Sequence, residues 1–277
     1  HHWQLVAGLR YDRFYFAYDN VLDSLYDHRD QMKGAVSPKF NLIFAPSKAL
    51  RFFFSAALGF HSNDSRVVIS QAGRQILPAA FGIESGAIFK PFPRLLLNFS
   101  LWQLDLQQEF VYVGDEAIVE ASGRTRRQGF DISARWQATA WLFADADFSY
   151  AHPRAKDEPE GQNFIPLAPV KTAIGGLTAQ SKSGWHGSLR IRYVGDRPAN
   201  EDGSLTAEGH FLTDLLAGLK KPRYEINLTI QNLFNNDFNE AQFETESRLA
   251  DETASVTELH FTPGAPFFLK GSLSYFF

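Results

Sequence analysis

The stretch that decides the fold is the chain's end, residues 267 to 277, which reads FFLKGSLSYFF. In an extended strand, one face would carry Phe267, Leu269, Gly271, Leu273, Tyr275 and Phe277. The opposite face would carry Phe268, Lys270, Ser272, Ser274 and Phe276. Because successive side chains of a strand point to opposite faces, this alternation predicts a β-strand with one apolar face and one mostly polar face.

The same alternation recurs along the chain, for example at residues 129–136, 188–193 and 225–231, and predicts an all-β antiparallel fold of about twelve strands. The predicted strands are residues 3–16, 32–45, 49–60, 82–91, 94–113, 124–137, 141–151, 169–180, 184–195, 209–220, 223–235 and 267–277. Residues 94–113 are the exception, because apolar side chains occupy both faces. That segment predicts either a bulge or a strand that leaves the bilayer.

The lengths of the connections separate a membrane barrel from a soluble sandwich, which alternation alone does not do. Tight links such as KPFPR, SKSG and KKPR take turns with long polar links, the longest at residues 236–264. An up-and-down transmembrane β-barrel has short periplasmic turns and long extracellular loops, so this arrangement favours such a barrel. An even number of strands brings both chain ends to the turn side.

Composition narrows the class of protein further. The 277 residues are 44% hydrophobic and include 26 Phe, yet no run approaches the roughly 18 to 20 apolar residues of a membrane-spanning helix. The net charge of −4 comes from interspersed charges and offers no basic face for nucleic acid. The absence of Cys excludes disulfides and thiolate metal sites. No nucleophile elbow, phosphate loop or dinucleotide fingerprint is present, so we expect neither catalysis nor a cofactor.

Several motifs resemble the barrel of TonB-dependent outer-membrane receptors, and their order covers nearly the whole chain. They are the hairpin at residues 37–64, the strand pair at residues 126–152, RYVGDRP at residues 192–198, NLFN at residues 232–235 and TPGAP at residues 262–266. The terminal strand also resembles the signal read by the barrel assembly machinery, through Lys270, Tyr275 and Phe277. Ser272 stands where that signal usually has glycine.

The resemblance implies outer-membrane transport of a scarce nutrient, such as a siderophore or cobalamin, in a Gram-negative bacterium. Barrels of this family have about 22 strands around a plug, so residues 1–277 are expected to be a transmembrane segment forming the C-terminal half. Neither the plug domain nor the TonB-contact motif is found in the sequence. The implied partners are a small-molecule ligand, TonB through a plug, the assembly machinery, outer-membrane lipid and lipopolysaccharide.

Six charged residues are candidates for lining the lumen and contacting a ligand: Arg51, Arg135, Asp145, Asp147, Arg190 and Arg192. The alternation places each of them on a polar face, where arginines would favour anionic substrates. The alternative is ordinary interior lining by ion pairs. Scattered histidines without a ligand-like spacing predict no metal site, and residues 244–260 are expected to gate or capture the ligand.

Two other functions stay open from sequence. Twelve strands could close into a smaller outer-membrane barrel that acts as a pore or an enzyme. The chain could also be a soluble all-β binding domain, which would have to bury most of its 26 Phe between two sheets.

Overall fold

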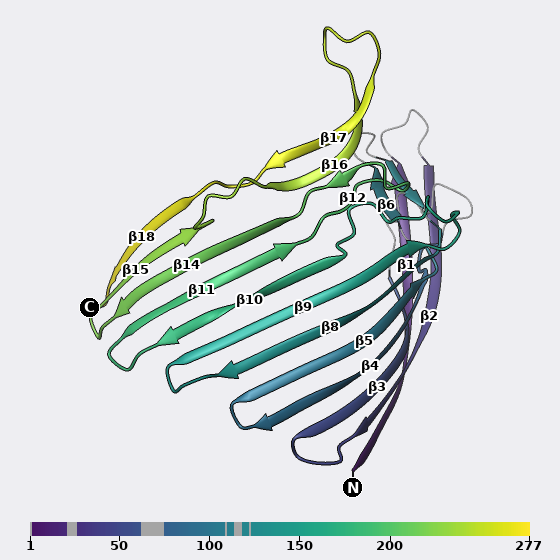
Figure 1. Cartoon of the computed structure of the whole chain (residues 1–277). Coiled ribbons are helices and arrows are strands. Elements are labelled where there is room, and N and C mark those ends of the chain that lie inside the picture. The colour runs from purple at the N-terminus through teal and green to yellow at the C-terminus, as the bar shows by residue number, and fades with distance from the viewer. Residues whose placement is uncertain (1, 21–26, 62–74, 109, 114–117, 122) are drawn as a thin grey trace.

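The computed structural model describes residues 2–20, 27–61, 75–108, 110–113, 118–121 and 123–277, and it is dominated by one twelve-stranded antiparallel sheet (Figure 1). The strands follow the order β1-β2-β3-β4-β5-β8-β9-β10-β11-β14-β15-β18. Their bounds are β1 Trp3–Asn20, β2 Asp27–Phe44, β3 Leu50–Phe60, β4 Ala79–Phe92, β5 Leu95–Leu106, β8 Thr125–Gln137, β9 Leu142–Ala155, β10 Lys171–Gln180, β11 Trp185–Val194, β14 His210–Lys220, β15 Tyr224–Gln231 and β18 Phe268–Tyr275.

Each strand of this sheet pairs with the sheet strand that precedes it in the chain, so the topology is a simple meander. The twelve predicted strands correspond one to one with these, and the all-β antiparallel prediction is confirmed. β1 and β2 are longer than predicted, because their pairing continues to Asn20 and Asp27. Backbone hydrogen bonds hold a ladder together where both faces are polar, and alternation gives no signal there.

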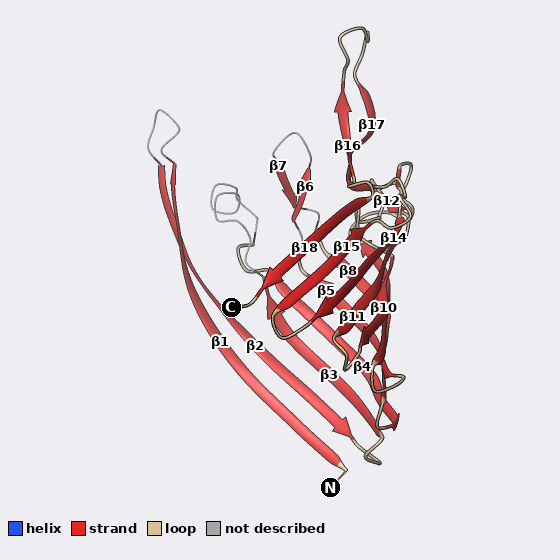
Figure 2. Cartoon of the chain, turned by 90° about the vertical axis from the view of Figure 1, so that its left-hand side faces the viewer, coloured by secondary structure: helices blue, strands red, loops and turns tan. Residues whose placement is uncertain are grey.

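Three small hairpins lie in the connections and were not predicted. They are β6 Phe110–Val113 with β7 Ile118–Ala121, β12 Arg197–Pro198 with β13 Thr206–Ala207, and β16 Asn239–Ser247 with β17 Val256–Pro263. The β16–β17 hairpin projects well beyond the sheet (Figure 2). The longest predicted loop therefore contains a regular ladder of its own.

The sheet has a turn end and a loop end. The short connections, at residues 45–49, 93–94, 138–141, 181–184 and 221–223, lie together along one end. Both chain ends are there too, because Trp3 pairs opposite Phe44 and Tyr275 opposite Tyr224. All connections that carry hairpins or long loops are at the other end, as the link lengths predicted.

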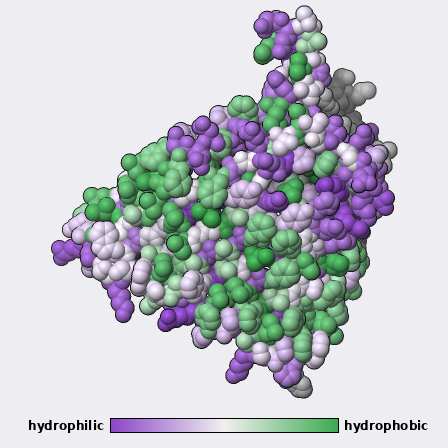
Figure 3. Space-filling view, viewed as in Figure 1, coloured by the Kyte–Doolittle hydropathy of each residue, from purple (hydrophilic) through white to green (hydrophobic). Residues whose placement is uncertain are grey.

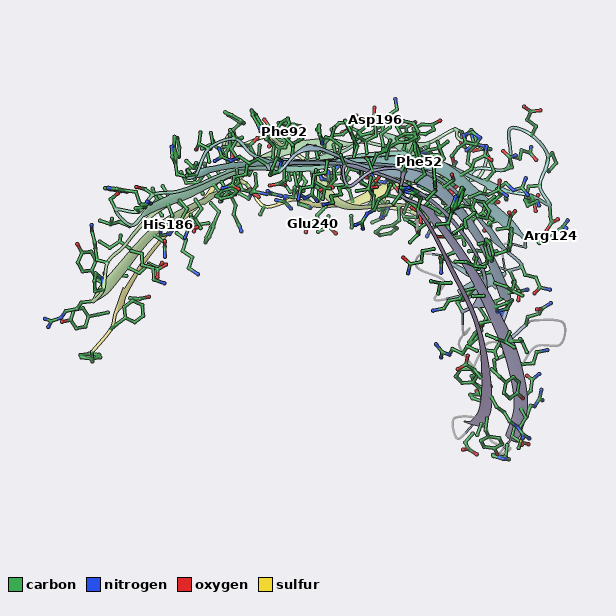
Figure 4. All side chains as sticks on the ribbon, turned by 90° about the horizontal axis from the view of Figure 1, so that it is seen from below. Phe52, Phe92, Arg124, His186, Asp196 and Glu240 are labelled. Carbon is green, nitrogen blue, oxygen red and sulfur yellow. The ribbon has the colours of Figure 1, made fainter. Side chains whose placement is uncertain are left out.

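The sheet curves into an arch with a concave and a convex face (Figure 4). The convex face carries large apolar side chains in the open, including Leu5 at 61%, Leu101 at 54% and Leu273 at 72% exposure. Figure 3 views this face and shows hydrophobic side chains across its middle, with hydrophilic ones gathered at the upper right. A single sheet without a second layer leaves this surface unburied in water, which suits a lipid environment. No helix in the described part of the chain is long and apolar enough to cross a membrane.

The arch is open within the described residues. β1 and β18 each pair on one side only, with β2 and β15 respectively, and not with each other. The twelve strands therefore do not close on themselves, and two edges offer unpaired backbone groups to further strands.

The exceptional segment, predicted as one strand over residues 94–113, is divided in the structure: β5 ends at Leu106, and residues 110–113 form β6 of a separate hairpin. β5 pairs with β8 without a register shift from Leu95 to Leu106, and its ladder with β4 shifts only near the turn end, between Phe89 and Phe92 of β4, so no bulge lies where both faces become apolar. On the convex face its apolar series ends at Leu101 and continues with Gln103 and Asp105. The polarity change fits a strand that leaves the bilayer, while Trp102 turns to the concave face.

Candidate functional site on the concave face

All six predicted site residues lie on the concave face, since residues opposite one another in register share a face. Five of them take part in three ion pairs that cross β8, β9, β11 and β14, here called the ion-pair ladder. It joins Arg135 to Asp147 (2.8 Å), Arg190 to Asp145 (2.6 Å) and Arg192 to Asp214 (3.2 Å). The three positive charges are thereby matched by three carboxylates.

Gly176 explains how Arg190 reaches Asp145 although β10 runs between their strands. Gly176 lies opposite both residues in register, so no side chain stands between them. A Cβ atom at this position would come within 3.0 Å of the Arg190 side chain and would overlap the backbone of β11. Glycine is therefore required for the guanidinium to lie flat across the strand.

A second contact of the same kind lies nearer the turn end. His186 on β11 bonds to Asn227 on β15 (2.9 Å) across Gly218 of β14. Asn227 also donates to Glu225 (3.1 Å), which lies 3.5 Å from Lys220. The concave face of β11, β14 and β15 thus carries a continuous polar network.

The NLFN motif ties this wall together at the loop end. Asn232 is only 3% exposed and has a left-handed backbone with φ of 50°, a conformation that asparagine tolerates better than most residues. Its side chain donates to the carbonyls of Asn236 (2.8 Å) and Ala265 (3.2 Å) and accepts from the Asn236 amide (2.9 Å). Its own amide donates to Asp214 (3.0 Å), which connects the motif to the ion-pair ladder.

At the loop end, three segments pack above the wall and are here called the loop cap. They are residues 156–170, residues 195–209 and the β16–β17 hairpin. Ile165, Ala199 and Ala207 are buried in it, at 8%, 3% and 0% exposure. The buried side chain of Gln242 bonds to both the amide (2.9 Å) and the carbonyl (2.8 Å) of Glu208. These contacts fix the base of the hairpin on the neighbouring loop.

One cationic residue at the base of the loop cap, Arg197, was missed in the sequence. Burial lowers the pKa of the Arg197 guanidinium, and burial together with the charges of Arg197 and Arg192 lowers the pKa of the neighbouring His210 ring. His210 also packs against Phe238, with ring centroids 5.1 Å apart. Arg197 lies within the RYVGDRP motif, so the signal was present, but the motif was read only as a strand end.

Arg51 stands apart from the ladder. It lies on β3, four strands from Asp147 in the same register row, which corresponds to about 19 Å at about 4.8 Å per strand. Its side chain is exposed beside the 45–49 turn. Among the described residues it has no carboxylate partner, unlike the arginines of the ladder.

The residues of the expected assembly signal lie on the edge strand or just beyond it. Lys270 pairs opposite Thr229 on β15, and the rings of Tyr275 and Phe277 meet edge to face at 5.2 Å. Phe277 is fully exposed. The outer edge of this strand offers unpaired backbone to another protein.

Chemically, the ion-pair ladder makes the part of this face that it covers a neutral, hydrogen-bonded wall. Its arginines hold carboxylates rather than a nucleophile or a general base. In the described ranges, no three His, Cys, Asp or Glu side chains come together as a metal site. The arrangement suits passage or contact of a polar molecule.

Comparison with known proteins shows which proteins share this fold. A family model described as "TonB dependent receptor-like, beta-barrel" matches residues 1–233. Among solved structures, the chain is similar to the ferric-catecholate import receptor Fiu of E. coli K12, with 16% identity, a TM-score of 0.74, and coverage of 99% of this chain and 42% of that one.

Two further structures give the same picture. The siderophore receptor PiuA from Acinetobacter baumannii shares 14% identity at a TM-score of 0.74, over 98% of this chain and 40% of that one. The ferric yersiniabactin uptake receptor FyuA from Yersinia pestis shares 14% identity at a TM-score of 0.73, over 100% and 43%. The chain thus spans less than half the length of each of these structures, and at such identities the likeness is one of fold.

Proposed function

Because the chain belongs to the TonB-dependent receptor family, as the match over residues 1–233 establishes, we propose that it forms part of the channel wall through which a receptor takes up a scarce nutrient. The family consists of transporters of the Gram-negative outer membrane rather than enzymes. The identification as the C-terminal part of such a barrel is confirmed, and the soluble alternative does not hold.

The observation that carries the proposal is the opposite character of the two faces of one sheet. The convex face is apolar and open, and the concave face bears the ion-pair ladder. A wall with lipid on one side and a watery lumen on the other needs this division. The open edges of β1 and β18 favour a larger barrel over a closed pore of twelve strands.

A ferric siderophore is the ligand class that we favour, with cobalamin as the alternative. The similar structures include an import receptor for ferric catecholate, a ferric citrate transporter and an uptake receptor for ferric yersiniabactin, although only the fold links them to this chain. We place the plug and the TonB contact in a part of the receptor outside residues 1–277. The loop cap would capture the ligand, and TonB would act through that plug.

Arg51 is the arginine that we assign to the ligand's path. The ladder arginines already hold carboxylates, so a passing anion would have to displace Asp145, Asp147 or Asp214 to reach them. Arg51 faces the lumen without such a competitor among the described residues. The ladder, in contrast, would keep the wall in shape.

Uptake of radiolabelled ferric siderophores by cells that express the receptor, with and without an active TonB system, tests the proposal. We expect uptake that requires TonB, and a several-fold lower rate for Arg51→Gln. Arg94→Gln is the matched control, because Arg94 is also exposed at the turn end. If cells that express the receptor took up none of the tested siderophores and no cobalamin in a TonB-dependent way, the proposed function would be refuted. An unchanged rate in Arg51→Gln would refute only its assigned role.

A further inference from the structure

A groove crosses the convex face of the sheet at one level, away from the lumen and the candidate site. Its volume is about 660 Å³, and it extends over β3, β4, β5, β8 and β9. The convex side chains that line it are Phe54, Ile83, Ser85, Leu101, Gln103, Gln128, Phe130, Tyr150 and His152.

The groove follows the border between two register rows. The row nearer the turn end is mostly apolar and aromatic and consists of Phe54, Ser85, Leu101, Phe130 and Tyr150. The next row toward the loop end turns polar and consists of Ala56, Ile83, Gln103, Gln128 and His152. Such a change along a lipid-facing surface marks the boundary between hydrocarbon and headgroups.

Side-chain size explains why the surface is hollow here. Ser85 stands between Phe54 and Leu101 in register, so a short side chain separates two large ones. Beyond Leu101, the Phe130 ring packs against Tyr150 with centroids 5.5 Å apart. These rings form an apolar wall beside a gap that the protein itself leaves unfilled.

The rim on the loop side carries excess positive charge. Asp105 lies 2.7 Å from Arg126 and 3.5 Å from Lys156, so one carboxylate faces two cations. Arg154 lies opposite Arg126 in register and stacks over the ring of Phe164 at 4.3 Å. The nearby pair of Arg124 and Asp157 is neutral as a unit. Among the residues that the structure describes at this rim, three cations, Arg126, Arg154 and Lys156, therefore stand against one carboxylate, Asp105.

From this arrangement we propose that the groove is a binding site for a phosphorylated lipid of the surrounding outer leaflet. One acyl chain occupies the apolar row beside Ser85, and the phosphate meets Lys156 and Arg126. Gln128 and His152 offer hydrogen-bonding groups between these two parts. An apolar trough with cations directly above it matches an anionic amphiphile, whereas a neutral lipid would leave the excess charge unmatched.

Native mass spectrometry of the protein, purified from outer membranes in detergent, tests the proposal. The probes are lipid A, its dephosphorylated form and inorganic phosphate. We expect lipid A to bind at least ten-fold more tightly than the dephosphorylated form, and inorganic phosphate not to displace it. Equal binding of both lipid forms, or displacement by phosphate alone, would overturn the lipid assignment.

Two variants and a control locate the site. Ser85→Trp fills the groove and is expected to weaken lipid A binding about ten-fold, and Lys156→Gln should weaken it several-fold without affecting the dephosphorylated form. Ala134→Trp adds the same bulk on the convex face of β8 but outside the groove lining, and should leave binding unchanged. Heat-modifiable gel mobility checks that each variant is folded. Wild-type affinity in a folded Ser85→Trp protein would place the lipid elsewhere and refute the groove.

Discussion

Substitutions of Asn232 should separate its two contributions to stability, which are the hydrogen bonds of its side chain and its tolerance of a left-handed backbone. Its side chain makes three hydrogen bonds in a site that is 3% exposed. At about 1 kcal/mol each, Asn232→Gly should lose roughly 3 kcal/mol of unfolding free energy. Asn232→Ala loses the same bonds and also holds a Cβ atom at a φ of 50°, which costs about 1 kcal/mol more.

The assay is urea unfolding of the protein in detergent micelles, followed by tryptophan fluorescence. We expect the unfolding free energy to decrease in the order wild type, Asn232→Gly, Asn232→Ala, with about 1 kcal/mol between the two variants. Asn236→Ala is the control, because its exposed side chain makes a single bond, to the Phe211 carbonyl (2.8 Å), and should cost about 1 kcal/mol or less. If glycine were no better than alanine, the backbone argument would be wrong. Losses below about 0.5 kcal/mol in both would refute the hydrogen-bond argument.

Three further changes probe other parts of the structure. Gln242→Ala removes two buried hydrogen bonds worth about 2 kcal/mol in total, so proteolysis of the loop cap should accelerate roughly thirty-fold. An unchanged rate would contradict the conclusion that these bonds fix the base of the hairpin. Gly176→Ala should cost about 1 to 3 kcal/mol of unfolding free energy by overpacking, whereas Gly271→Ala, whose Cβ would meet nothing within 4 Å, should cost almost nothing. Hydrogen bonds from Arg124 hold the pKa of Asp157 below its ordinary value. The contact between Arg124 and Asp157 is therefore fully formed when the pH is above the ordinary pKa of an aspartate, and it is lost as the pH falls through the lowered pKa of Asp157. Protection of the Arg124 amide against hydrogen exchange should follow this loss, and Asp157→Asn should abolish its pH dependence.

The strands were predictable because a membrane-spanning sheet has one apolar and one polar face, so apolar and polar residues alternate along each strand. At residues 129–136, for example, every second side chain faces lipid, and the observed β8 carries them as expected. The same rule correctly assigned Arg135, Arg190 and Arg192 to the polar face. Four of the five short links contain Pro or Gly, which marked their turn positions, and the link at residues 138–141 contains neither.

The pairings within the polar face were not predictable. Alternation identifies a face but not the register between strands, so it did not single out Asp214 as the partner of Arg192. Nothing in the alternation marks Gly176, although it decides that Arg190 reaches Asp145. The loop cap was missed because its hairpins mix polar and apolar side chains on both faces and are stabilised by backbone bonds, which leave no periodic signal.

The glycine-bridged contacts bear on how such a wall can remain both rigid and open. The Arg190 side chain lies across Gly176 and that of His186 lies near Gly218, so long polar side chains run along the sheet and find partners two strands away. A side chain held this way stiffens the wall without narrowing the lumen, and its charge is already balanced. Any selectivity for an anionic ligand would then have to come from cations outside the ladder. Arg51 at the turn end and Arg197 under the loop cap are at opposite ends of the path, with the neutral ladder between them.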